Sequence, residues 1–220
     1  LLADGQARGC GDISGAVGAK GTVAGWRWDL SSVYGRNSLN YDVSHSNNAS
    51  MGLSSPTQFD AGGLAFGQST TNLDFFRDVG VGSRLSVRTA VGAEFRLDQF
   101  QINAGDDASW INGNQPILDG PNANSTTVRP APGAQGFPGF RPSDEQDVTR
   151  NNYALYVDVE SDVTRRFLVG LAGRFEDYSD FGSTTTGKLT TRVALTPQLA
   201  LRGAVNTGFR APSLGQSYFS

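Results

Sequence analysis

Alternation of apolar and polar residues is the strongest pattern along this chain. From Leu85 to Asp98, the odd-numbered positions are mostly apolar and the even-numbered positions are mostly charged or small. This period of two is typical of a β-strand with one apolar and one polar face. Similar segments at 26–45, 152–160, 167–176, 188–195 and 199–206, with weaker ones at about 12–21 and 62–77, bring the predicted number of antiparallel strands to eight.

The parity of the apolar positions changes once inside a predicted strand. Apolar residues occupy even positions from Trp26 to Leu30 but odd positions from Leu39 to Val43. One extra residue in a strand exchanges its two faces. We therefore expect a β-bulge at Gly35-Arg36-Asn37, between the two parts.

The connections between the predicted strands alternate in length. Outer-membrane barrels have short turns at one end and long extracellular loops at the other, whereas soluble sandwiches have no reason to separate loop lengths in this way. The longest segment, about 103–148, is therefore expected to be extracellular. The short connections are expected at 22–25, 78–83, 161–166 and 196–198, and the long ones at about 46–61, 103–148 and 178–185.

Strand length and aromatic placement also favour a membrane barrel. The segments 26–45 and 85–102 are longer than the roughly 9 to 11 residues that cross a bilayer as a strand. Aromatic residues gather near strand ends, as interfacial girdles require. The sequence therefore predicts an all-β fold, an antiparallel up-and-down transmembrane β-barrel segment. The aromatic residues in question are Trp26, Trp28, Phe95, Phe100, Tyr153, Phe167 and Phe175.

Composition agrees with this fold class. The 220 residues include 28 Gly and 10% aromatic residues, which suit strands and turns. The apolar runs are far shorter than the roughly 20 residues of a membrane-spanning helix. The formal net charge is -3 and the Lys and Arg residues are scattered, so no basic surface for nucleic acid is expected.

The residues that could build an active site are few. Cys10 is the single cysteine, so an internal disulfide is impossible, and His45 is the single histidine. A hydrolytic triad or a histidine-rich metal site would rest on that one side chain. The acidic residues at 106–107 and 144–147 lie in the longest loop without the spacing of a calcium site.

One motif resembles a nucleotide-binding loop. Residues 182–188 have P-loop spacing, but Leu189 stands where Ser or Thr should hold magnesium. A P-loop also feeds a helix, and Lys188 opens a predicted strand. We therefore expect no nucleotide site, no catalytic residues, no metal and no cofactor, and the chain is not expected to be an enzyme.

The long segment 103–148 carries the candidate ligand-binding residues. It is rich in Pro, Gly, Asn and Ser, and loops of this length are usually functional or disordered. Aromatic and arginine side chains among flexible residues suit ligand capture. The equal alternative is that the segment is disordered or packs as a simple lid. The candidates are Trp110, Arg129, Phe137, Phe140 and Arg141.

The polar faces of three predicted strands carry charges of both signs. Mixed charge is expected of the hydrated lumen of a barrel. The functional hypothesis is contact with a plug or a passing ligand, and the alternative is a wall held by cross-strand ion pairs. The predicted lumen-facing residues are Glu94, Arg96, Asp98, Asp158, Glu160, Arg174 and Glu176.

Two stretches carry a family resemblance. Residues 202–214, RGAVNTGFRAPSL, resemble the R-G-x-x-x-T-G-F-R-A-P-S-L signature of TonB-dependent receptors. Residues 174–182, RFEDYSDFG, resemble the R-[YF]-E-x-Y-S-D-F-G segment that precedes it in the same family. One predicted hairpin lies between the two, as in the family, and looser similarity extends through 26–37, 59–63 and 133–140.

The resemblance implies a barrel of about 22 strands whose lumen is filled by an N-terminal plug. The chain is then expected to be a partial barrel domain over 1–220, with the plug, the TonB box and the last strands outside it. The implied function is active import of a scarce nutrient, in the class of ferric siderophores, cobalamin or carbohydrates, through the outer membrane of a Gram-negative bacterium. The implied partners are outer-membrane lipid, a small-molecule ligand and, through the plug, the TonB complex.

Two other classes of protein fit part of the pattern. Eight strands can close a small barrel packed by its own side chains, so a complete outer-membrane protein with a structural or adhesive role is one alternative. A soluble lipocalin-like binder is the other, and it would require the face that carries Val87 and Val91 to point inward.

Overall fold

The computed structural model describes residues 4–81 and 85–219, which form one antiparallel sheet with its strands in chain order. This confirms the predicted all-β, up-and-down fold. Residues 82–84, part of the short connection predicted at 78–83, lie outside the described residues. None of the described helices is long and apolar enough to cross a membrane. The strands are β1 (Asp4–Val23), β2 (Trp26–Ser44), β3 (Gln58–Val81), β4 (Leu85–Asn103), β5 (Gln146–Thr164), β6 (Phe167–Tyr178), β7 (Gly182–Ala194) and β8 (Ala200–Asn206).

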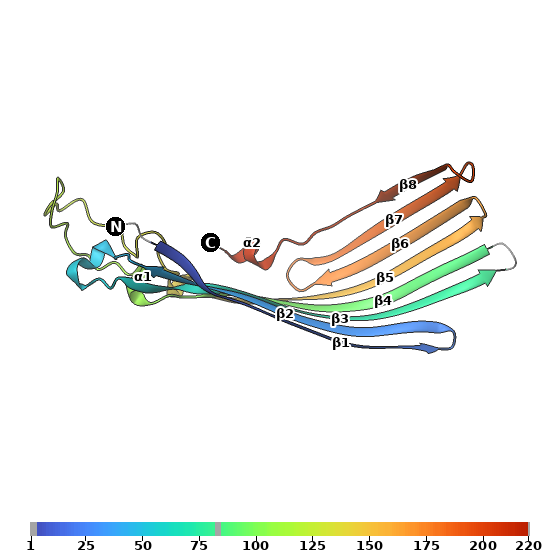
Figure 1. The fold of residues 1–220 in the computed structure, drawn as a ribbon, viewed down its shortest axis with the longest axis horizontal. Helices are drawn as coiled ribbons and strands as arrows, with labels where there is room; N and C mark the ends of the chain where they lie inside the picture. The colour runs from blue at the N-terminus through green and yellow to red at the C-terminus, as the bar shows by residue number, and fades with distance from the viewer. Residues whose placement is uncertain (1–3, 82–84, 220) are drawn as a thin grey trace.

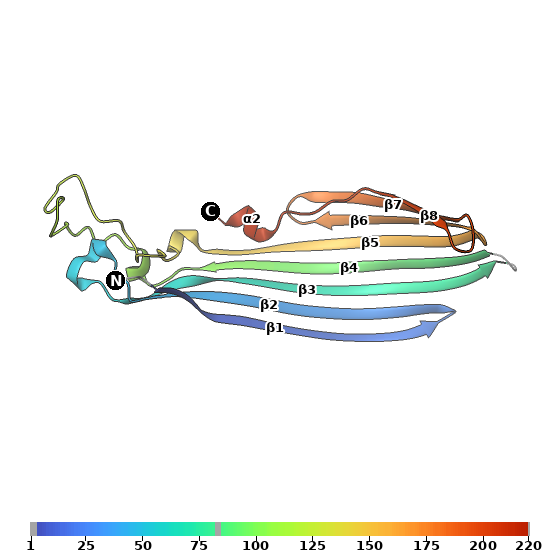
Figure 2. The same cartoon turned by 45° about the horizontal axis from the view of Figure 1, so that its top comes forward.

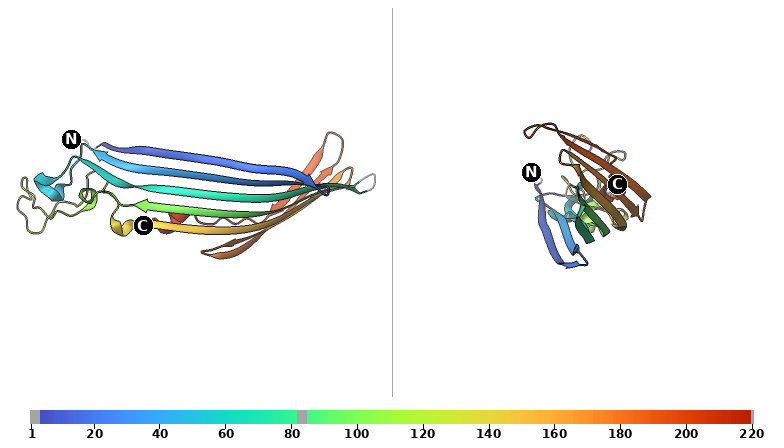
Figure 3. Two further views of the ribbon diagram at one scale, coloured as in Figure 1. Left: turned by 90° about the horizontal axis from the view of Figure 1, so that it is seen from below. Right: turned by 90° about the vertical axis from the view of Figure 1, so that its right-hand side faces the viewer.

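The sheet is long, twisted and open (Figures 1 and 2). Its order leaves β1 and β8 as the two edges, and the view along the strands in Figure 3 shows an arc and not a closed ring. An arc of this kind favours a section of a larger barrel over a complete eight-stranded one. The 19 residues of β4 span roughly 60 Å, well beyond the hydrocarbon thickness of a bilayer.

Short turns gather at one end of the sheet and long loops at the other (Figure 1). Ala24 and Gly25 join β1 to β2, and both have positive φ, 48° and 80°, as a type I′ hairpin turn requires. Arg165 and Arg166 alone join β5 to β6, where the Thr164 hydroxyl accepts hydrogen bonds from two backbone amides. The opposite end, called here the loop end, carries the segments 45–57 and 104–145.

The connection predicted as long at 178–185 is wrong. Only residues 179–181 separate β6 from β7, and Tyr178 pairs directly with Gly182. The Ser and Thr residues from 183 onward looked like loop residues, but threonine suits a strand and each of them has a partner in β6.

The two faces of the sheet differ in what covers them. The α2 helix (Leu214–Tyr218) lies on the concave face, where Leu214 packs on Phe100 and Ile102 (Figures 1 and 3). We call this the inner face and the opposite one the outer face. The even-numbered positions of β4 point to the inner face, and register places even positions of β5 to β8 beside them.

The outer face is apolar and uncovered over the turn-end part of the sheet. Leu155, Leu171 and Val205 are 61%, 59% and 73% exposed there. Along β4 the outer positions from Val87 to Leu97 are apolar except for Thr89, and they are polar from there to the loop end. A band of this height on tilted strands matches the roughly 25 Å apolar belt of a barrel in a bilayer.

The expected bulge at Gly35-Arg36-Asn37 is wrong. β2 pairs without a register shift through these residues with both neighbours. The apolar residues change parity because they change face: Leu30 lies on the outer face, whereas Tyr41 and Val43 lie on the inner face beneath the loops. The bulges lie in the partner strands, between Ala7 and Cys10 and opposite the step from Asn40 to Asp42.

The two long segments pack on the inner face at the loop end. They contain η1 (Ala49–Ser54), α1 (Asp107–Trp110) and η2 (Pro142–Asp144). Beneath them Phe59, Val43 and Ala134 form one buried cluster, and Phe100, Ile102 and Leu214 form a second. The parts of 104–145 next to the strands are therefore folded onto the sheet.

Asn48 joins the two long segments. It is fully buried, and its side-chain amide donates to the carbonyl oxygens of Ala108 and Ile111, both at 2.9 Å. Its side-chain oxygen accepts from the backbone amide and the hydroxyl of Ser50, at 3.2 and 2.6 Å. All the hydrogen-bonding capacity of the side chain is used, so this residue fixes one loop against the other.

The first prediction tests the two faces. Val91→Arg, at mid-height on the outer face, should destabilise the barrel in lipid by about 2 to 4 kcal/mol, because the guanidinium would enter hydrocarbon. Ala90→Arg is the matched control on the inner face, beside a cavity. Gly92 is unsuitable as the control because a Cβ there would clash with the Tyr156 ring and the Asp74 carboxylate. The measurement is a folding titration in lipid vesicles, and equal costs would contradict the assignment of faces.

The second prediction tests the joint between the loops. Asn48→Ala should remove the amide donor from the carbonyls of Ala108 and Ile111, at a cost of about 0.5 to 1.5 kcal/mol for each hydrogen bond, and loosen the segment 104–145. Limited proteolysis should then cut this segment faster than in the parent. Asn47→Ala, an exposed neighbour, should leave the cutting rate unchanged. Identical rates in the two variants would show that Asn48 does not hold the loops together.

Candidate functional site

The inner face carries several groups of paired charged side chains, called here the inner-face network. Its centre is Arg174 on β6, whose Nη2 lies 3.2 Å from the Glu94 carboxylate on β4 and 3.0 Å from that of Glu176. Toward the loop end, Arg96 Nε lies 3.7 Å from Asp98, which accepts a hydrogen bond from Gln68 at 2.8 Å. The pair of Arg174 with Glu94 crosses strands, whereas its pair with Glu176 and that of Arg96 with Asp98 lie along one strand.

The network continues toward the turn end. Arg88 pairs with Glu160 and, at 3.2 Å, with Asp162. The Tyr156 hydroxyl donates to Asp74 at 2.5 Å and links β5 to β3. Strand register thus places all seven residues predicted to face the lumen on the inner face. Six of them form ion pairs with one another or with Arg88, and the seventh, Asp158, lines a cavity.

The cavity on the inner face has a volume of about 560 Å³. Tyr156, Asp158 and Arg174 form one side of it, and Lys188 and Asn206 form the other. Its lining is mixed in charge and rich in hydrogen-bonding groups. Such a surface can hold water or a polar group.

Aromatic rings form a row on the inner face at the loop end. The Tyr41 ring centroid on β2 lies 4.9 Å from that of Phe137, and Phe137 lies 5.7 Å from Phe140. Phe140 in turn lies 6.1 Å from Phe219 near the end of the chain. The first three rings are partly buried and Phe219 is 56% exposed. We call these four residues the aromatic row.

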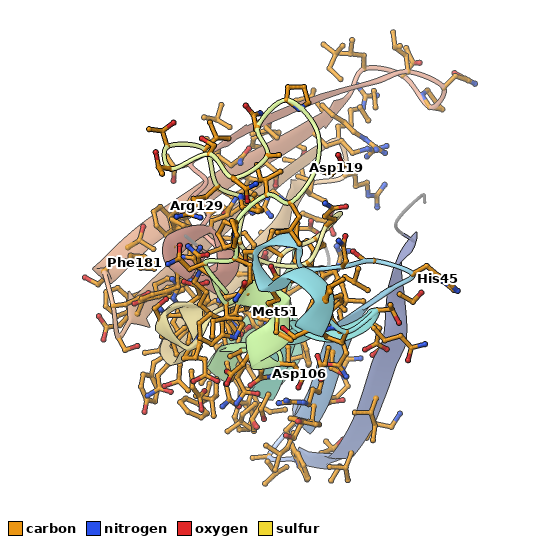
Figure 4. All side chains as sticks on the ribbon, turned by 90° about the vertical axis from the view of Figure 1, so that its left-hand side faces the viewer. His45, Met51, Asp106, Asp119, Arg129 and Phe181 are labelled. Atoms are coloured by element: carbon orange, nitrogen blue, oxygen red, sulfur yellow. The ribbon has the colours of Figure 1, made fainter. Side chains whose placement is uncertain are left out.

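The structure separates the candidate ligand-binding residues of the long segment into two groups. Phe137 and Phe140 belong to the aromatic row, and Trp110 lies against the sheet side of the loop with its Nε1 donating to the Gly105 carbonyl at 3.3 Å. Arg129 and Arg141 are exposed. Figure 4 shows Arg129 and Asp119 on the loop tip that projects beyond the folded part. The role of all five in ligand binding stays a prediction.

His45 lies at the rim of the loop end, on the opposite side from Phe181 (Figure 4). It lines a separate cavity of about 310 Å³ with Asp42, Asp60 and Asp106. Within the described ranges, no group of His, Cys, Asp and Glu side chains has an arrangement that could hold a metal ion.

The two signature stretches meet in space around Arg150 of β5. Its guanidinium bonds Asp180, from the first stretch, at 2.6 Å and donates to the Pro212 carbonyl, from the second, at 2.6 Å. Phe181 of the first stretch lies 5.5 Å from Phe209 of the second. We call residues 207–219 the strap, because they leave β8 and return across the inner face to the loop end (Figure 1).

Several of these residues were not among the sequence-based candidates. Arg88 and Tyr156 share the even parity of Glu94 and Asp158, so the alternating pattern could have identified them. Arg150 could have been found in the same way, but its partners could not, because they lie in a turn and in the strap. Tyr41 and Phe219 gave no signal, since their positions in the row depend on how the loops fold.

Comparison with known proteins agrees with the geometry. A family model for the TonB dependent receptor-like β-barrel matches residues 6–220. No curated protein matches the chain. The family consists of outer-membrane β-barrel transporters and not enzymes, and its model spans all eight strands, both signatures and the strap. The chain therefore belongs to the TonB-dependent receptor-like β-barrel family.

Proposed function

We propose that this chain is part of the barrel of an outer-membrane receptor that imports a scarce nutrient with energy supplied by the TonB complex. The observation that carries the proposal is the contrast between the faces. The outer face exposes an apolar band, whereas the inner face carries charged networks and a polar cavity. A wall that is apolar outside and polar inside suits a hydrated passage through lipid.

The proposed ligand surface is the aromatic row with the exposed part of the segment 104–145. The row lies on the inner face at the loop end, where a ligand from outside the cell would arrive first. The partly buried rings of the row and exposed Phe219 can bury ligand area at low entropic cost, and Arg141 and Arg129 on the long segment can pair with anionic groups. A siderophore, a cobalamin and a carbohydrate all remain within this chemistry.

Energy from the inner membrane is part of the proposal because of the size of the passage. A barrel of about 22 strands encloses a lumen wide enough to leak unless a plug fills it. The inner face carries both positive and negative side chains, and those that form its ion pairs are partly exposed to water. They therefore suit reversible polar contact with such a plug. The plug would carry the contact with TonB, and moving it would require work.

The third prediction concerns orientation. In a Cys10→Ser background, Asn122→Cys should react with a membrane-impermeant thiol reagent on intact cells, because residue 122 lies on the exposed loop tip. Gln198→Cys, exposed in the turn between β7 and β8, is the control for the other side. It should react only after the outer membrane is broken. The reverse order of labelling would place the long loop in the periplasm.

The fourth prediction separates binding from import in the full-length receptor. Cells without TonB, or treated with a proton uncoupler, should bind ligand at the surface with unchanged affinity but fail to accumulate it, because contacts with loops need no energy and passage does. Deleting 104–145 should instead weaken binding first. Import at an unchanged rate without TonB would rule out the proposal, since an open pore would then explain it.

A further inference from the structure

The strap reaches the loop end with few direct ties to the sheet. Beyond β8 the Thr207 amide donates to the Gly187 carbonyl at 2.9 Å, and after that the strap makes no strand pairing in the part of the chain that the structure describes. Leu214 packs on Phe100 and Ile102 and is 2% exposed. The position of the strap therefore depends on a small number of side chains.

Arg150 makes the strongest of these contacts. Its side chain is 4% exposed, and its Nε and Nη2 lie 2.7 and 2.6 Å from one oxygen of Asp180. Its Nη1 donates to the Pro212 carbonyl at 2.6 Å. Short bonds of this kind, with an ionised donor, are about twice as strong as neutral ones. One planar guanidinium thus ties β5, the turn between β6 and β7, and the strap together.

One ring of an aromatic cluster covers this charge. The Arg150 Cζ lies 5.3 Å from the Phe181 ring centroid, within the range of a cation–π contact. Phe181 stacks on Tyr178 at 4.4 Å, and Phe209 of the strap contacts both rings, at 5.5 and 6.2 Å. The guanidinium is almost fully shielded from water, which strengthens its bonds.

We infer that Arg150 is a positioning residue for the ligand surface: it clasps the strap so that Phe219 completes the aromatic row. The strap runs from the clasp at Pro212 through α2 to Phe219, whose ring lies 6.1 Å from Phe140. Loss of the hydrogen bond from Arg150 to Pro212 would free the strap at its middle and let Phe219 leave the aromatic row. The link to ligand binding rests on the proposed function, whereas the clasp itself can be tested without ligand.

The test measures how readily the strap leaves the sheet in the full-length receptor, in a Cys10→Ser background. A cysteine replacing buried Leu214 reports on the strap, and a cysteine replacing Ala134, which is also 2% exposed, reports on the neighbouring loop cluster. Adding Arg150→Met should raise the thiol reaction rate at position 214 by about tenfold to hundredfold, the factor for losing a hydrogen bond to a charged group. The rate at position 134 should not change.

Two further variants keep the inference testable if Arg150→Met does not fold. Arg150→Lys keeps the positive charge but loses the planar guanidinium with its several donors. Asp180→Asn keeps the hydrogen bond from Arg150 to Pro212. Each variant should therefore raise the thiol reaction rate at position 214 by less than Arg150→Met. Arg88→Met removes two inner-face ion pairs away from the strap and should leave position 214 unchanged.

An unchanged rate at position 214 in the folded Arg150 variants would overturn the inference. An equal rise at positions 214 and 134 would overturn it as well, because the loosening would then be general. None of these measurements uses TonB or a ligand. Failure of the import hypothesis would therefore leave the result on the clasp intact.

Discussion

The structure depends on one constraint: each strand has only two faces, and the two must meet different surroundings. Side chains alternate across a strand, so the pairing register decides which residue meets which medium. Between β4 and β5 the register runs from Val87 opposite Ser161 to Ile102 opposite Gln146 without a shift. A slip of β4 by one residue at this pairing would turn Glu94 outward, away from Arg174 on β6, and bring Val91 inward.

The two media exchange places along the strands. On β4 the outer face is apolar up to Leu97, while the inner face becomes apolar at Phe100 and Ile102. Over the turn-end part of the sheet, apolar residues lie on the outer face. At the loop end they lie on the inner face, because the packed loops cover that face. The long strands β2 and β4 therefore each carry two amphipathic patterns of opposite sense, which meet on β4 near Asp98.

This exchange explains what could be predicted from the sequence. The strands and the inner-face charges followed from parity, because the period of two is set by the backbone and not by tertiary contacts. The expected bulge at Gly35-Arg36-Asn37 failed because a change of face and a bulge leave the same mark in the sequence. The aromatic row and the clasp of Arg150 involve residues far apart in the chain, such as Tyr41 with Phe137 and Arg150 with Pro212, which local patterns do not connect.

The loop end owes its shape to the sheet and not only to the loops. Strands continue past Leu97 to Asn103 on β4, and their inner face supplies the floor on which both long segments and the strap rest. The loop end is thus built on strands that extend roughly 15 Å or more beyond the apolar band. A change in bilayer thickness would act on the apolar band and not on this extension of the strands. The recognition surface would keep its geometry in membranes of different composition, and only its height above the headgroups would vary.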